Sequence, residues 1–298
     1  MTSRFRNYAR WDLTINRGLY RSGAITVAAL FVAITLINFL QRYAQVSLAG
    51  NMGSPSGAVS WLTTVTKWTF AIAAGYMFHN MLERKNRIQE LTIPATACEK
   101  FGWHALVLMG GSLVCCLGSL VLSDALQALL TLIFVDAASV QSLTVAFFGN
   151  TPLADTLGQL EMSVNMSVPG TQLDGMEAPA MVLATAQRIM DWHLLYMVAS
   201  CICFSGIFAY VNSIRYKSNI VHTIVLLVLV TLACVVISSV ALVSWAMANS
   251  DAFLQFLAQH LFAWVNIWYA FMVVLGAGGW WGAYRRFTHA QLITRTNP

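Results

Sequence analysis

The sequence predicts an all-α polytopic membrane protein with six transmembrane helices. Of its 298 residues, 58% are hydrophobic and only 10% are charged, whereas a soluble domain carries about 25% charged residues. Inside a bilayer the backbone must form helices or a closed barrel. The apolar runs of this chain are much longer than the ~10 residues of a barrel strand. We therefore expect helices.

Six apolar runs give the spans of a single membrane domain that covers residues 1–298. The predicted spans are 22–46, 58–81, 104–134, 192–214, 220–247 and 253–284. With both termini in the cytoplasm, 14 of the 17 Lys and Arg residues lie on the cytoplasmic side, as the positive-inside rule requires. The expected location is the bacterial cytoplasmic (inner) membrane.

The N-terminal segment 1–21 is basic and amphipathic. Arg6, Arg10, Arg17 and Arg21 recur at helical spacing and share one face, which is typical of a helix in the headgroup layer. The alternative is a positively charged flank of the first span with no further role.

Two ionisable residues fall inside predicted spans, where charge is costly. Lys67 lies in the span 58–81 and Asp124 in the span 104–134. Both are candidates to line a polar path through the bundle. Lys67 could instead extend its ammonium group outward to the membrane surface.

Small residues at helical spacing predict two close helix contacts. Gly111, Cys115, Ser119 and Ser123 recur every four residues in the third predicted span, and Gly278 and Gly282 form a GxxxG pair in the last. Such residues let helix backbones approach one another in a membrane.

The segment 136–188 is the one sizeable extramembrane insertion, and it is expected on the outer side, between the third and fourth spans. It holds five acidic residues against one Arg. Residues 160–168 alternate between apolar and polar, which predicts a half-buried strand. Residues 139–148 are a candidate pairing strand, so the insertion is predicted to contain β-structure.

The segment 82–103, which we call the elbow segment, is the longest charged run between two apolar spans. Pro94 ends a short helix there. Thr96 with Glu99 three residues later predicts a capping box that starts the next helix. The elbow segment is either an ordinary cytoplasmic loop or a docking surface for a cytoplasmic partner.

Part of the elbow segment resembles a known family. Arg87-Ile88, Leu91, Pro94-Ala95 and Glu99-Lys100-Phe101 resemble the segment that follows the second membrane helix in bacterial ABC-2-type transporter permeases. The usual family form has a Gly-Thr pair where this chain has Ile88-Gln89, and a longer gap before the proline.

The resemblance implies that the chain is the permease subunit of an ABC-2-like transporter. Its partners would be a separate ABC ATPase subunit, a second permease copy and membrane lipid. In that family the segment forms a coupling helix that sits in a groove of the ATPase. The implied coupling residues are Glu83, Arg87, Glu90, Leu91, Ile93, Pro94, Glu99, Lys100 and Phe101. The larger outer loop of the family lies between spans five and six, whereas here the insertion precedes span four.

The sequence carries no signature of catalysis within the chain. It has no GxxxxGK[ST], HExxH, GxSxG or CxxC, and its six cysteines have no metal-ligand spacing. We expect no enzyme activity, no cofactor, no metal and no nucleic-acid partner. The alternative function is a non-transporting scaffold or sensor whose segment 136–188 binds a ligand or partner. A secondary transporter is a weaker third reading, because the spans lack paired broken helices.

Overall fold

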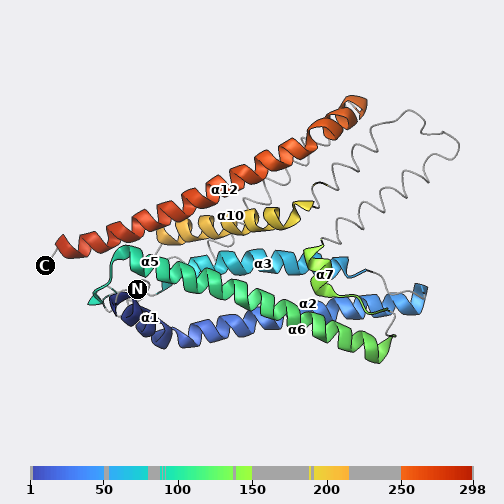
Figure 1. Cartoon of the computed structure of the whole chain (residues 1–298), viewed down its shortest axis with the longest axis horizontal. Helices are drawn as coiled ribbons and strands as arrows, with labels where there is room; N and C mark the ends of the chain where they lie inside the picture. Colours follow the sequence, from blue (N-terminus) through green and yellow to red (C-terminus); the bar gives the residue numbers. More distant parts are fainter. Residues whose placement is uncertain are drawn as a thin grey trace.

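The computed structural model describes residues 3–49, 54–79, 88, 90, 92–136, 139–149, 188, 191–214 and 250–296. Within these ranges every regular element is a helix (Figure 1). The elements are α1 (Ser3–Ile15), α2 (Arg17–Ala49), α3 (Ser56–Tyr76), α5 (Ala97–Ala105), the π-helical segment η2 (Leu106–Gly110), α6 (Gly111–Phe134), α7 (Leu143–Phe148), α10 (His193–Ile214) and α12 (Ser250–Thr296).

Among the described residues, four helices are long and apolar enough to cross a membrane, which supports a multi-pass membrane protein. They are Arg17–Val46, Ala97–Phe134, His193–Ser213 and Phe262–His289. The predicted span 58–81 does form a helix, α3, but its run of threonines with Lys67 leaves it outside this set. The predicted span 220–247 lies outside the described residues.

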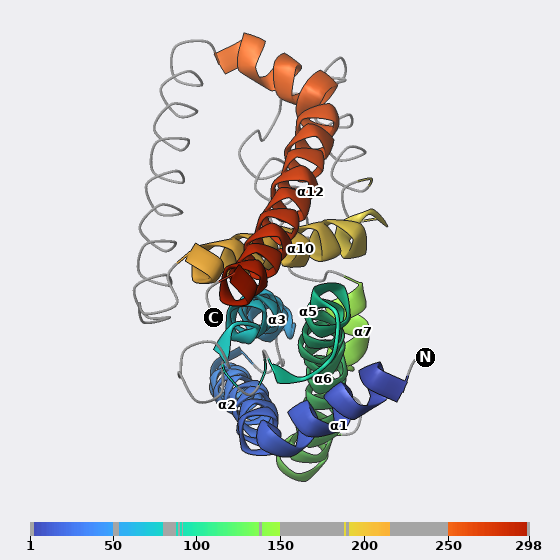
Figure 2. The same cartoon turned by 90° about the vertical axis from the view of Figure 1, so that its left-hand side faces the viewer.

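Helix α3 lies at the centre of the bundle. One core cluster joins its second half to α10 and α12, through side chains such as Ala74, Phe208 and Ala283. A second cluster joins its first half to α2, α6 and α7, through Leu62, Phe31 and Leu120 among others. Figure 2, which looks along the helices, shows α3 between α10 above and α2 and α6 below. A helix covered in this way needs less apolar surface than one that faces lipid.

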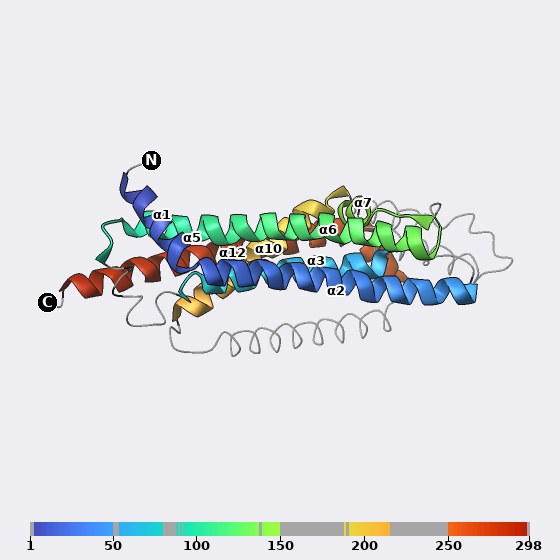
Figure 3. The ribbon, with the colours of Figure 1, turned by 90° about the horizontal axis from the view of Figure 1, so that it is seen from below.

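The two termini lie at one end of the bundle. This end also holds α1 and the start of α5, while α7 lies toward the opposite end (Figure 1). Figure 3 shows α2 and α6 running side by side between these ends. That both termini lie on one side of a membrane, and that this side is the cytoplasm, stays a prediction.

Glycines make the contact between α10 and α12, but only one of the two predicted glycines contributes. A Cβ on Gly276 would come within 2.5 Å of the Ile202 carbonyl oxygen, and Cβ atoms on Gly206 or Gly279 would overlap the facing backbone. Gly282 packs against the Tyr210 ring. A Cβ on Gly278 would meet no described residue within 4 Å, so Gly278 makes no part of the contact with α10. The GxxxG spacing identified the right helix and, in Gly282, one of the glycines that contact α10.

We expect Gly279→Val to force α10 and α12 apart. Overpacking typically costs about 1–3 kcal/mol, and here the obstacle is backbone, which cannot rotate away. The thermal unfolding temperature in detergent should therefore fall clearly. Gly278→Val adds the same side chain one residue earlier, into open space, and should leave that temperature nearly unchanged. Equal effects of the two substitutions would contradict the assigned contact.

The predicted small-residue ridge on α6 is correct in its second half only. Ser119 and Ser123 are buried, whereas Gly111 is exposed and Cys115 only partly covered. The buried face begins instead with Ser112 and Cys116. This face packs against α2 and α3.

The candidate pairing strand at 139–148 is not a strand: residues Leu143–Phe148 form the helix α7. Ser142 caps α7, because its hydroxyl accepts a hydrogen bond from the Val145 amide at 3.2 Å. Asp124 supplies a second anchor, with its Oδ1 accepting from the Leu143 amide at 2.6 Å and its Oδ2 from the Ser142 hydroxyl at 2.8 Å. Capping chemistry has outweighed the β-branched composition. The predicted strand 160–168 lies outside the described residues.

Candidate functional site

A cluster of buried ionisable side chains lies where α1 meets the start of α5. Its members are Tyr8, Asp12, Glu90, Lys100 and His104, which we call the buried cluster; each is at most 3% exposed. Only 10% of the chain is charged. Buried ionisable groups must be paired and hydrogen-bonded to be tolerated. Because four such groups and a tyrosine gather in one place, this end of the bundle is the candidate functional site.

Asp12 holds α1 against α5 and α2. Its Oδ2 accepts hydrogen bonds from the Tyr20 hydroxyl at 2.7 Å and from the Trp103 indole nitrogen at 2.9 Å. Its Oδ1 accepts from the Asn16 amide at 2.6 Å and lies 3.9 Å from His104 Nδ1. One carboxylate on α1 thus joins donors from α2, from α5 and from Asn16, which lies between α1 and α2. Removing it would leave these donors without an acceptor.

Glu90 joins the elbow segment to the same contact. The Tyr8 hydroxyl donates to Glu90 Oε1 at 3.1 Å, and His104 Nε2 lies 2.8 Å from the hydroxyl and 3.3 Å from Oε1. Burial, with the charges of Glu90 and Asp12, raises the pKa of Tyr8 far above its ordinary value. The Tyr8 hydroxyl therefore stays protonated and donates a hydrogen bond to Glu90 Oε1. His104 Nε2 must then be the donor toward the Tyr8 oxygen.

Lys100 completes the buried cluster from α5. Its ammonium group donates to the backbone carbonyl of Glu90 and lies 5.9 Å from the centre of the Tyr8 ring. Lys100 thus fixes the backbone of the elbow segment, while the Glu90 side chain reaches α1. The two ends of the elbow segment are thereby tied to each other and to α1, where Tyr8 lies 82 residues before Glu90.

Of the predicted coupling residues, two turn inward. Glu90 is 1% and Lys100 is 2% exposed, and both side chains are bonded within the buried cluster. Phe101 also packs within the chain, with ring centres 5.3 Å from Tyr284 and 5.8 Å from Phe287. α1 covers Glu90 and Lys100 through Tyr8, and α12 covers Phe101 through Tyr284 and Phe287.

The other predicted coupling residues fall into two groups. The predicted capping box is confirmed: the Glu99 amide donates to Thr96 Oγ1 at 3.2 Å, and the Thr96 amide donates to Glu99 Oε2 at 2.8 Å. Pro94 is exposed and Ile93 partly so. Glu83, Arg87 and Leu91 lie outside the described residues, and the coupling role of the segment stays a prediction.

Sequence reasoning did not find Tyr8, Asp12, Trp103 and His104. One signal was present: Asp12 is the only acidic residue before Glu83 and stands on a helix rich in arginine. A single acid in such a place indicates a specific partner. Spacing along the chain could not reveal that the partners come from α5 and from the elbow segment.

A π-helical turn separates the buried cluster from the middle of the bundle. η2 (Leu106–Gly110) begins two residues after His104 and joins α5 to α6 without a break. π-turns inside α-helices occur frequently at functional sites. Met109 and Gly110 of this turn line a cavity, so the turn connects the cluster to that cavity.

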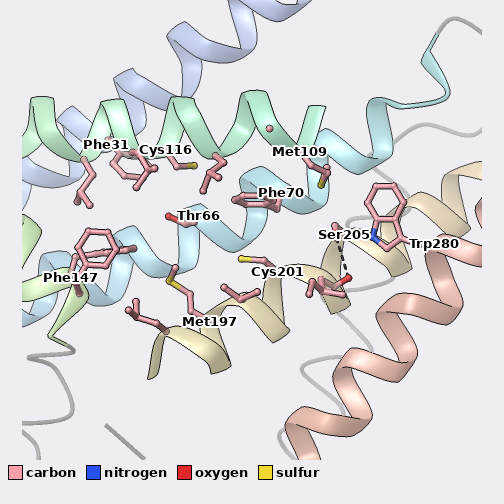
Figure 4. Close-up of a pocket in the computed structure, with 18 residues that line it drawn as sticks. Phe31, Thr66, Phe70, Met109, Cys116, Phe147, Met197, Cys201, Ser205 and Trp280 are labelled. Atoms are coloured by element: carbon pink, nitrogen blue, oxygen red, sulfur yellow. Dashed lines mark hydrogen bonds between the residues drawn. The ribbon is translucent and has the colours of Figure 1, made fainter. Parts of the chain in front are cut away.

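The cavity is an apolar groove of about 760 Å³ between α6 and α10. Helix α3 forms its floor, Phe147 of α7 lies at one end and Trp280 of α12 at the other (Figure 4). α6 and α10 both pack on α3 and scarcely touch one another. Of the two predicted intramembrane polar residues, Asp124 anchors α7 and does not line the groove.

Residues within the described ranges form no cluster of three or more His, Cys, Asp or Glu suited to a metal ion. The chemistry available to this end of the molecule is thus hydrogen bonding and charge pairing between helices. No family model, no curated protein and no solved structure matches the chain.

Proposed function

We propose that the chain is the permease subunit of an ABC-2-like transporter and moves a substrate across the membrane with the help of a separate ATPase subunit. The observation that carries the proposal is the way in which the elbow segment is tied to the helix that follows it. The capping box starts α5, and α5 continues through η2 into α6.

The buried cluster couples any movement of the elbow segment to movement of α5. Glu90 and Lys100 fix the elbow segment to α1 and α5 through interactions that exclude water. A partner that displaced the elbow segment would therefore displace α5 with it. Because α5, η2 and α6 are continuous, the displacement would reach the wall of the groove.

The docking surface of the elbow segment differs from the one that the sequence predicts. Ile88 is 51% exposed and Pro94 is also exposed. These apolar positions are the described part of the surface that a partner would meet, together with the predicted Glu83, Arg87 and Leu91. Glu90, Lys100 and Phe101 instead hold the surface in place from behind.

Co-purification tests the proposal. The protein is purified from native membranes in mild detergent, and the bound proteins are identified by mass spectrometry. We expect a P-loop ATPase in stoichiometric amount. A partner held through segment 136–188, with no ATPase, would instead support a scaffold or sensor.

A further inference from the structure

His104 lies at the centre of the buried cluster, between two carboxylates from different parts of the chain. Its Nε2 lies 3.3 Å from Glu90 Oε1, and its Nδ1 lies 3.9 Å from Asp12 Oδ1. The residue is 3% exposed. Both ring nitrogens therefore face carboxylate oxygens inside the protein, one on the elbow segment and one on α1.

The hydrogen bonds around Tyr8 favour a second proton on His104. The Tyr8 hydroxyl donates to Glu90 Oε1, so His104 Nε2 is the donor toward the Tyr8 oxygen, which lies 2.8 Å away. In a neutral imidazole the other nitrogen, Nδ1, then carries a lone pair. That lone pair faces the Asp12 carboxylate and is repelled by it. A proton on Nδ1 replaces the repulsion by an attraction between an imidazolium and a carboxylate.

The charges of the buried cluster balance when His104 carries this proton. Asp12 and Glu90 contribute two negative charges, Lys100 contributes one positive charge, and the imidazolium supplies the other. A neutral His104 leaves a net negative charge in a place that excludes water, which is costly. Glu90 Oε2 has no hydrogen-bond partner among the described residues, so the Glu90 carboxylate relies on the charge of His104.

The other titratable groups around His104 keep one protonation state near neutral pH. Among the described residues they are Tyr8 and Asp12 on α1, Tyr20 on α2, Glu90 on the elbow segment and Lys100 on α5. Carboxyl groups ordinarily titrate near pH 4, and tyrosine and lysine near about pH 10. Histidine ordinarily titrates near about pH 6.5. His104 is thus the member of the cluster whose charge responds to moderate changes of pH.

A change of charge on His104 acts on α1 and on the elbow segment together. α1 packs on α2 and α5, and its contact with α5 is made through the buried cluster and the edge-to-face pair of Phe5 and Trp103. The elbow segment reaches the same point through Glu90. Both lie at the end of the bundle that holds the two termini (Figure 1).

We propose that His104 is a proton-binding site that fastens α1 and the elbow segment to α5, and that loss of its proton at raised pH releases both. The folded contact holds the proton more tightly than a free imidazole does. Its stabilising effect is therefore complete below about pH 6.5 and is lost as the pH rises. The inference concerns this chain alone and holds with or without an ATPase partner.

Hydrogen exchange of the purified full-length protein in detergent tests the proposal. Exchange is measured at pH 6 and pH 8.5 and expressed as protection factors, which removes the direct effect of pH on amide exchange. We expect the protection of α1 and of the elbow segment to fall about tenfold or more, within the limit of about tenfold per pH unit for one proton. The protection of α6 should stay within about twofold, because it lies outside the cluster.

His104→Gln keeps a donor toward Tyr8 but has no proton to lose. The protection of α1 in this variant should be low at both pH values and differ by less than about twofold between them. His289→Gln makes the same change at an exposed position on α12 and should retain the full pH effect. A role of His104 in packing alone would lower protection without removing the pH effect.

Glu90→Gln keeps the test decisive if His104→Gln does not fold. It removes one negative charge, so that a neutral His104 balances the cluster, and the pH effect should shrink to less than about threefold. Equal protection of α1 at both pH values in the unmodified protein would overturn the proposal. So would a pH effect that either variant retains in full, because another group, such as the exposed Cys98, would then be responsible.

Discussion

Replacing Asp12 with alanine is expected to detach α1 from α5. The substitution leaves the side chains of Asn16, Tyr20 and Trp103 without their acceptor. Removing one partner from a buried charged contact costs about 3–5 kcal/mol. Three kcal/mol is a more than hundredfold increase in the population of the detached helix at about 1.4 kcal/mol per tenfold. Hydrogen exchange across α1 should accelerate accordingly.

Thiol access gives a second readout of the same event. Ala9 is 9% exposed, so Ala9→Cys should react slowly with a maleimide and become reactive when Asp12→Ala is added. The measurement needs a Cys98→Ser background, because Cys98 is exposed. Arg10→Ala changes an exposed side chain on the same helix and should alter the free energy of unfolding by less than about 0.5 kcal/mol. If Asp12→Ala protected α1 as well as Arg10→Ala does, the assigned role of Asp12 would be wrong.

Glu90→Lys is expected to destabilise the protein itself. The new ammonium group would lie, buried, beside Lys100 and His104, and the Tyr8 hydroxyl would lose its acceptor. We expect a loss of about 4 kcal/mol in the free energy of unfolding, in the range for broken buried pairs. Glu90→Gln keeps an acceptor oxygen and should cost about 1 kcal/mol, the value of one hydrogen bond.

Thermal unfolding and size-exclusion profiles in detergent distinguish the two possible roles of Glu90. A residue on the docking surface could be changed to lysine with no loss of stability and with loss of partner binding. A member of the buried cluster could not. An unchanged unfolding temperature for Glu90→Lys would contradict the buried role of Glu90 and would support a place on the docking surface.

The features that could be predicted from the sequence are those that composition or local spacing determines. Low charge and long apolar runs gave the membrane class, and Thr96 with Glu99 gave the start of α5. The helical spacing of Arg6 and Arg10 predicted α1, but the predicted single helix over 1–21 is wrong in extent, because α1 ends at Ile15 and Arg17 and Arg21 lie on α2. Each of these depends on residues that are neighbours along the chain, so no knowledge of the packing was needed.

The features that were missed depend on which helices come together. The charges of Glu90 and Lys100 led to the prediction that both residues lie on an exposed surface. The prediction failed because spacing along the chain cannot show that α1 covers that surface. Gly276 and Gly279 make the contact with α10, whereas the GxxxG rule selected Gly278, because the pattern carries no information about the facing helix. The composition of residues 139–148 predicted a strand. Local spacing could not show that Asp124, about 20 positions earlier in the chain, anchors a helix there.

The most direct test of the proposed function is the amount of P-loop ATPase that stays bound to three forms of the protein. These are the unmodified chain, Ile88→Asp and Val145→Asp, purified in parallel from native membranes. Ile88 is 51% exposed on the elbow segment, and Val145 is 71% exposed on α7, toward the opposite end of the bundle. We expect one ATPase per chain for the unmodified protein and Val145→Asp, and at least a tenfold loss for Ile88→Asp. An unmodified chain that retains no ATPase, or an Ile88→Asp variant that retains it fully, would contradict the account.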